Sequence, residues 1–298
     1  MNARPVFKAL TVVSLLLIVV PFSVRSQDDD PKAIKAEVFI KARPTRTSRN
    51  SAKYKPVAKS NDGAAAKPPE GMVFVQMGLT MWRFRRSKAT DKTKELVEED
   101  DGQQVEWTLE RVPEGTLLSP GQRVRLSFES LSRTGYLYVV DREEYADGSF
   151  GDPILIYPTQ KSVSDYRVEP GRLTYIPSTT GRFRIKPSES EKKQVAESIT
   201  FIVSPKPLID EGQLGSKSIK LLPQQFEEWQ KQWTTSASKF EMEGGPGQSM
   251  TSAEQSAARQ GSPLLTQEDP VPQTVYRVAI KPEAPLLIVV PLKFAQEN

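Results

Sequence analysis

Hydrophobic and polar residues alternate with a period of two over much of the chain. The clearest case is residues 123–130, where Val124, Leu126 and Phe128 alternate with charged or small polar residues. Successive side chains of a strand point to opposite faces, so this pattern predicts a half-buried strand with its charged face toward solvent. Residues 136–140 are apolar on both faces, as in a central strand, and we expect the two strands to pair as an antiparallel hairpin.

Further apolar runs are separated by Gly, Pro and Asp turns, at residues 72–86, 154–157, 173–176, 183–185, 199–203, 275–280 and 286–294. Short strands at such spacing predict a mostly-β fold, either an antiparallel β-sandwich or a partly open barrel. The last run, 286–294, is apolar on both faces, and we expect it to insert into the sheet and close the domain.

The C-terminal third also predicts one or two short helices. Residues 223–233 begin with proline, which suits the first position of a helix, and an apolar stripe runs through Leu222, Phe226, Trp229 and Trp233. We expect the stripe to pack on a sheet, and a partner-binding face formed by Trp229 and Trp233 is the alternative. Thr251 and Glu254 have the spacing of a capping box, which indicates a second short helix.

The first 70 residues differ from the rest. Residues 1–26 combine a basic start with a 12-residue run, apolar but for two residues, and end in a small residue, which predicts a signal peptide cleaved before Gln27; an uncleaved anchor is the alternative. Residues 27–70 are rich in Lys, Ser, Ala and Pro, hold ten Lys or Arg against six Asp or Glu, and predict a disordered basic linker or tether. Residues 71–298 are expected to form a single β-rich domain.

The amino-acid composition excludes several kinds of catalytic and binding site. The chain of 298 residues has no cysteine and no histidine, which excludes disulfides, thiolate nucleophiles and mechanisms that use a histidine base. The formal net charge is +4, but residues 71–298 hold 28 Lys or Arg against 31 Asp or Glu, which argues against a nucleic-acid groove. No catalytic motif is found, so we expect no enzyme activity, and no segment after the signal peptide is long enough to span a membrane as a helix.

Acidic residues crowd the segment 141–152. Calcium takes six to eight oxygen ligands from flexible loops, so a Ca²⁺ site could use Asp141, Glu143, Asp147 and Asp152. The spacing does not match an EF-hand, and a charged hairpin loop is the structure that we expect. A carboxylate pair that cleaves glycosides is a further alternative, and it would need a cleft.

The order SPGQRVRLSFES, GYLYVVDRE, ILIYPT and VEPGRLTYIP resembles the bacterial domain of unknown function 4384 family. The resemblance covers about residues 76–207, and residues 208–298 look like the extension of a longer, secreted subtype. Gln122 stands in the turn where the family more often has Asp. The resemblance implies a β-rich module of secreted or envelope proteins, and it carries over no activity, cofactor or site residue.

These observations together predict a secreted or periplasmic, envelope-associated protein that acts as a non-catalytic binding or structural module. Its partner would be an envelope protein or glycan, bound by adding a strand to an exposed sheet edge. The alternatives are a carboxylate-dependent hydrolase of envelope polysaccharide and a calcium-stabilised adhesion module. Two acids facing each other across a cleft, one with a raised pKa, would favour the hydrolase, and an apolar surface patch would favour the binding module.

Overall fold

The computed structural model describes residues 40–45, 68–186, 191–242, 245–259 and 261–295. The predicted signal peptide and most of the predicted linker lie outside these residues. All the described residues belong to one compact unit. No helix among them is long and apolar enough to cross a membrane.

The first sheet is built on the long strand β1, Val73–Arg86. One edge of β1 pairs with β4, Arg123–Ser130, and the other edge pairs first with β13, Thr274–Ile280, and then with β3, Gln104–Val112. All these pairings are antiparallel. The sheet is completed at its edges by β2 (Glu95–Glu98), β8 (Thr174–Ile176), β9 (Phe183–Arg184) and β12 (Ala237–Glu241).

The second sheet is centred on β5, Gly135–Tyr145, as its apolar faces predict. β5 pairs along its length with β10, Gln194–Ser204, which in turn pairs with β14, Leu286–Lys293. The opposite edge of β5 carries the short strands β6 (Ile154–Tyr157), β7 (Arg167–Val168) and, beyond β6, β11 (Ile219–Lys220).

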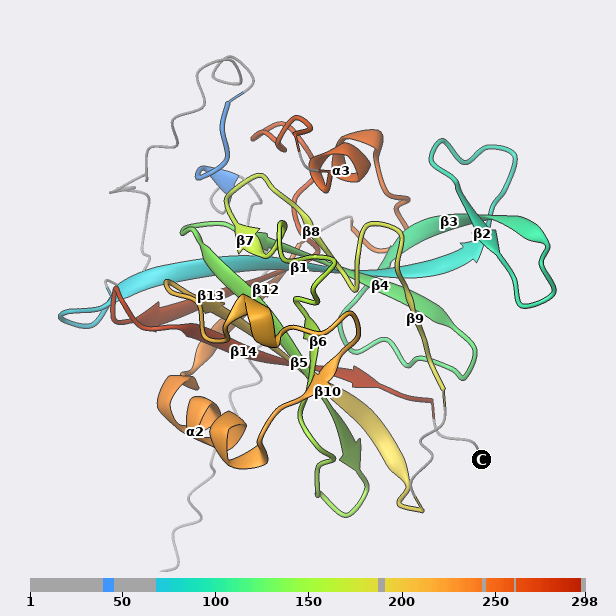
Figure 1. The fold of residues 1–298 in the computed structure, drawn as a ribbon. Helices are drawn as coiled ribbons and strands as arrows, with labels where there is room; N and C mark the ends of the chain where they lie inside the picture. Colours follow the sequence, from blue (N-terminus) through green and yellow to red (C-terminus); the bar gives the residue numbers. More distant parts are fainter. Residues whose placement is uncertain (1–39, 46–67, 187–190, 243–244, 260, 296–298) are drawn as a thin grey trace, which may run out of the picture. The chain divides into compact units, whose positions relative to one another are not determined.

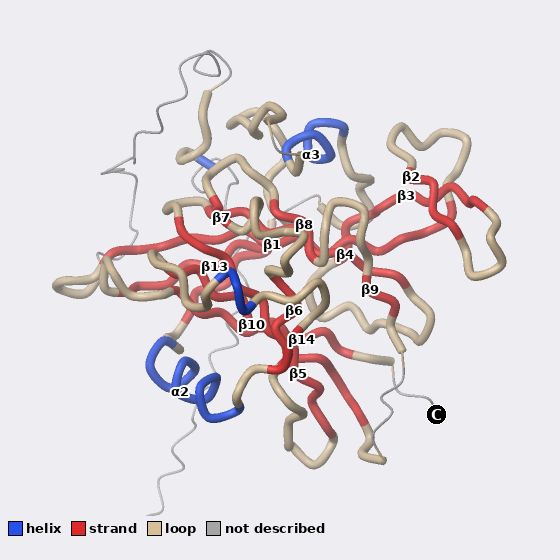
Figure 2. The backbone as a smooth tube through the Cα atoms, in the orientation of Figure 1, coloured by secondary structure: helices blue, strands red, loops and turns tan. Residues whose placement is uncertain are grey.

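The main core lies between the two sheets. Phe128 of β4 and Phe201 of β10 are both fully buried and stack with ring centroids 5.9 Å apart, which joins one sheet to the other. The fold includes a curled antiparallel half-barrel sheet, and the strands fill the centre of Figure 2. The predicted mostly-β antiparallel fold is therefore confirmed.

Two short helices lie in the C-terminal third, as predicted, and Figure 1 shows them on different sides of the sheets. Helix α2, Pro223–Trp233, packs on the core through Phe226. Helix α3, Ser252–Ala257, begins with the predicted capping box, in which the Glu254 N–H donates to Thr251 Oγ1 at 3.2 Å. α3 covers a second, smaller core that includes Trp82, Phe84, Leu109 and Tyr175.

The predicted hairpin of β4 and β5 is wrong, because the two strands belong to different sheets. The Leu131 N–H donates to the Gln76 carbonyl at 3.0 Å and keeps the end of β4 on β1. Gly135 then starts β5 directly against β10, where a Cβ would lie 2.8 Å from the Ser204 carbonyl oxygen. Only glycine permits that approach. The residues between Ser130 and Gly135 therefore lead the chain from the first sheet to the second.

The last strand also differs from its prediction, because β14 lies at an edge of the second sheet and is not inserted into it. A strand with two apolar faces can occupy an edge here because α2 packs beside it, and Thr234, just after α2, forms a bridge with Leu287. The helix does not cover all of β14, since 40% of the surface of Val289 is exposed.

The expected solvent-facing side of β4 is wrong as well, since every residue of β4 is buried. Arg123, Arg125, Ser127 and Glu129 point away from the main core, but other segments cover them. Alternation identified the strand correctly, and it could not show that its polar face would be covered too.

We predict that Phe128→Ala lowers the free energy of unfolding by about 3–5 kcal/mol, because it removes a buried ring at the junction of the two sheets. The matched control is Phe150→Ala, since Phe150 is 46% exposed and its loss should cost much less. Denaturant unfolding measures both. Equal losses for the two variants would contradict the placement of Phe128 at this junction.

Candidate functional site

The polar face of β4 is covered by paired charges. Arg125 is fully buried, and its guanidinium donates to the two Glu95 carboxylate oxygens at 2.8 and 2.9 Å and to the Gly181 carbonyl at 2.7 Å. The same group lies 5.0 Å from the ring centroid of Phe84. Arg123 donates in the same bidentate way to Glu99. Paired guanidinium and carboxylate groups with full hydrogen bonding can be buried where single charges cannot.

Glu129 completes this face, and its partner comes from the N-terminal part of the chain. Arg43 donates from Nε to Glu129 Oε1 at 2.7 Å and from Nη2 to Oε2 at 2.6 Å, and both side chains are only 1% exposed. The Gly171 N–H donates to the same carboxylate at 3.0 Å. Burial acts against the charge of Arg43, but the attraction and hydrogen bonds of Glu129, together with the charges of Asp269 and Glu254, outweigh it, so the pKa of Arg43 is raised.

Backbone carbonyls satisfy the remaining side of the Arg43 guanidinium. Nη1 donates to the carbonyl oxygens of Thr266 at 3.3 Å, Asp269 at 3.1 Å and Pro270 at 3.1 Å. The Asp269 carboxylate holds this turn in place by accepting the Thr266 N–H at 2.7 Å and its hydroxyl at 2.9 Å. The turn therefore presents three carbonyl acceptors that converge on one nitrogen of the guanidinium, while Glu129 takes the other two.

The backbone around Arg43 is held as well as its side chain. The Gln267 side-chain amide donates to the carbonyls of Lys41 at 3.2 Å and Arg43 at 3.0 Å, and the Gln267 N–H donates to the Pro44 carbonyl at 3.2 Å. Ile40 is buried. We call residues 40–45 the arm segment, and we call Glu129, Gly171 and residues 266–270 the arginine site.

The arm segment lies inside the stretch predicted as a linker, and sequence reasoning missed the whole site. The arm has no apolar period, and Glu129 was expected to face solvent. The available signal was the polar face of β4, which carries two arginines and a glutamate and so can form ion pairs with segments that cover it.

The structure does not gather the carboxylates proposed as calcium ligands. Asp141 and Glu143 lie on β5, whereas Asp147 pairs with Lys192 at 3.1 Å and Asp152 pairs with Lys220 at 2.9 Å. The Ser149 side chain and N–H donate to Asp147 and lower its pKa to about 2. Within the described residues, no group of three or more acidic side chains could hold a metal ion.

Asp141 and Glu143 instead form an acidic cluster with Glu197 of β10, which the sequence did not single out. Glu197 lies opposite Glu143, and Asp141 lies opposite Ile199, in the pairing of β5 with β10. Burial raises the pKa of Asp141 to about 8 and that of Glu197 to about 7, and the neighbouring carboxylates add to both shifts. The three groups stand side by side on one sheet and not across a cleft.

Trp229 and Trp233, the candidates for a partner-binding face, lie on α2. Their rings stack with centroids 5.5 Å apart, and Trp229 is only 9% exposed because it packs on the main core. Trp233 is partly buried against the same core. The exposed end of the stripe is Leu222, with 71% of its surface accessible. Trp229 therefore serves mainly to hold the helix on the sheet.

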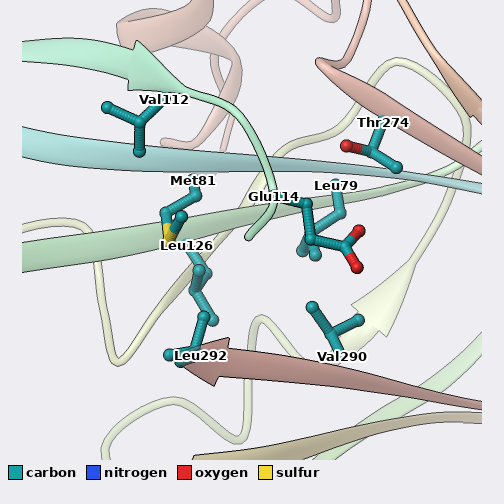
Figure 3. A pocket seen from close by; sticks show the side chains of 8 residues that line it. All are labelled: Leu79, Met81, Val112, Glu114, Leu126, Thr274, Val290 and Leu292. Carbon is teal, nitrogen blue, oxygen red and sulfur yellow. The ribbon is translucent and has the colours of Figure 1, made fainter. Parts of the chain in front are cut away.

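Figure 3 shows a pocket between the two sheets, lined by Leu79, Met81, Val112, Glu114, Leu126, Thr274, Val290 and Leu292. Its volume of ≈ 10 Å³ is room for about one water molecule. The Glu114 carboxylate at its side accepts the Tyr276 hydroxyl and pairs with Lys239 at 3.1 Å. This pocket is too small to bind a sugar ring.

No protein-family model, curated protein or solved structure matches the chain. The resemblance to the domain of unknown function 4384 family therefore stays a prediction.

We predict that unfolding stability falls as the pH rises from 5 to 8, and that Asp141→Asn/Glu197→Gln flattens this fall. In that range the folded protein keeps protons that the unfolded chain, with pKa values of about 4, has already lost. At pH 8 the double variant should be more stable than the wild type by roughly 1–3 kcal/mol.

Denaturant unfolding at a series of pH values measures this effect. Asp147→Asn, in the turn just after β5, is the matched control, because Asp147 titrates near pH 2 and its loss should leave the slope between pH 5 and 8 unchanged. Parallel profiles for the wild type and the double variant would show that the two carboxyl groups are not shifted.

Proposed function

We propose that the protein is a non-catalytic binding module of the cell envelope that recognises an arginine-bearing peptide segment. The observation that carries the proposal is the arginine site, where the side chain of Arg43 and the backbone of the arm segment are bound together. The signal-like residues 1–26 and the family resemblance support the envelope location.

The site contacts both a side chain and the backbone around it, and a peptide ligand supplies both kinds of group. A bidentate carboxylate distinguishes arginine from lysine, and the three carbonyls of the turn supply further acceptors for the cation. The Gln267 side chain donates hydrogen bonds to backbone carbonyls, which every peptide has. The site thus combines an arginine anchor with main-chain contacts, as peptide-recognition surfaces do.

Addition of a partner strand, the binding mode expected from the sequence, is disfavoured at β14, the long edge strand of the second sheet. The carbonyl of Lys293 in β14 accepts the Leu118 N–H, so odd-numbered residues of β14 direct their backbone groups toward the open edge. Pro291 occupies such a position and has no N–H to offer. An edge with a missing donor resists pairing with another chain, so we place recognition at the arginine site.

A carboxylate-dependent hydrolase is the second candidate, because the raised pKa values of Asp141 and Glu197 are of the kind found at catalytic acids. A general acid and its partner must flank a substrate, whereas these groups stand side by side on adjacent strands. Release of reducing ends from envelope polysaccharide, lost in Asp141→Asn, would favour this candidate. The four carboxylates suggested for a calcium-stabilised module do not converge on one site, since Asp147 and Asp152 pair with different lysines.

We predict that full-length Arg43→Ala binds a synthetic peptide of residues 37–48 and gains thermal stability from it. A ligand that binds only the folded state at a hundredfold excess over its dissociation constant adds about 2.7 kcal/mol. For a domain of this size that is a rise in Tm of roughly 5–10 °C. Thermal unfolding with increasing peptide measures the effect.

Two controls define the site. The same peptide carrying Arg43→Ala should cause no shift, and neither peptide should shift the host Arg43→Ala/Glu129→Gln. Arg43→Lys serves as a second host, since it keeps a cation beside Glu129 if the alanine variant does not fold. The proposal fails if the wild-type peptide stabilises neither host.

A further inference from the structure

The occupant of the arginine site is joined to the domain by a long connection. Residues 46–67 separate the arm segment from the first described residue before β1, which is a stretch of 22 residues. At about 3.4 Å per residue such a stretch spans at most roughly 75 Å. A domain of this size has a radius of gyration of only about 17 Å. The length of the connection therefore permits the arm segment to reach the arginine site of a neighbouring molecule.

We propose that the arginine site also binds the arm segment of a second copy of this chain, so that molecules are linked by exchange of their arms. This inference rests on the proposed function, and it names a second copy of the chain as the partner. The segment and the site are chemically complementary, and every copy carries both of them.

The contacts of the arm do not depend on which molecule supplies it. The partners of Arg43 lie at least 86 positions further along the chain, and the same holds for the contacts that Gln267 makes with the arm backbone. Each of these contacts joins the arm segment to the arginine site and not to the residues that connect them. A second copy's arm can therefore make the same set of bonds.

Competition within one molecule sets when exchange occurs. An arm that belongs to the same molecule meets the site at a high effective concentration, so a dilute wild-type protein fills its own site. Exchange is favoured where copies are crowded, and it is exposed directly when the internal pairing is removed by mutation. Arg43→Ala leaves Glu129 without its own cation, and Glu129→Gln leaves the arm intact while it removes the charge of its own site.

The test mixes these two full-length variants. Arg43→Ala and Glu129→Gln should each be monomeric alone and should form a complex of one copy each when combined, seen by size exclusion with light scattering. The matched control replaces Arg43→Ala by Arg43→Ala/Glu129→Gln, which has no intact site and should give no complex. Free peptide of residues 37–48 in excess should dissociate the complex.

A second measurement uses the wild-type sequence and does not depend on the folding of the variants. Two populations labelled with donor and acceptor dyes are incubated together at high protein concentration, and energy transfer between them should increase and then be lost on addition of the peptide.

The outcomes separate the two proposals. Exchange is overturned if the mixed variants stay monomeric while the peptide still binds Arg43→Ala, and the proposed function then stands. It is also overturned if Glu129→Gln self-associates equally well alone, because the contact would lie elsewhere. If neither the peptide nor the second copy binds, both proposals fail together.

Discussion

The carboxylate of Glu129 is buried on the face of the first sheet that points away from the main core. Three segments that are distant in sequence surround it: the arm segment, Gly171 and the turn 266–270. An unpaired charge at such a place would cost several kcal/mol, so the fold must supply a cation and hydrogen-bond donors there. Arg43 supplies the cation and Gly171 supplies an N–H, while the turn 266–270 satisfies the rest of the guanidinium. The positions of the arm segment and of both turns are therefore linked through one side chain.

The same constraint acts along the whole of β4. Arg123 and Arg125 are paired with glutamates of the β2 region and stack on Trp107 and Phe84, so the segment that carries β2 covers the strand. This arrangement leaves the first sheet with two covered faces, one apolar and one built from ion pairs. Bidentate ion pairs form only when both side chains are correctly oriented, so a layer of paired charges fixes which segments pack together more strictly than an apolar layer does.

Local patterns predicted the elements well, and long-range pairing was beyond them. Period-two alternation located β4, and a run that is apolar on both faces located β5. The proline start and the capping box located α2 and α3. All these signals lie in residues that are close together in the sequence. The pairing of β4 with β1, the cover over Arg125 and the docking of Arg43 depend on residues tens to hundreds of positions apart. A charged position on a strand looks the same in sequence whether water or a distant partner meets it.

The most direct test of this account is a double-mutant cycle on Arg43→Met and Glu129→Gln, followed by denaturant unfolding of the full chain. If the buried pair holds the arm segment to the first sheet, each single variant should lose about 3–5 kcal/mol, and the double variant should lose clearly less than the two together. Losses that add within about 0.5 kcal/mol would contradict the account, because the two side chains would then act independently.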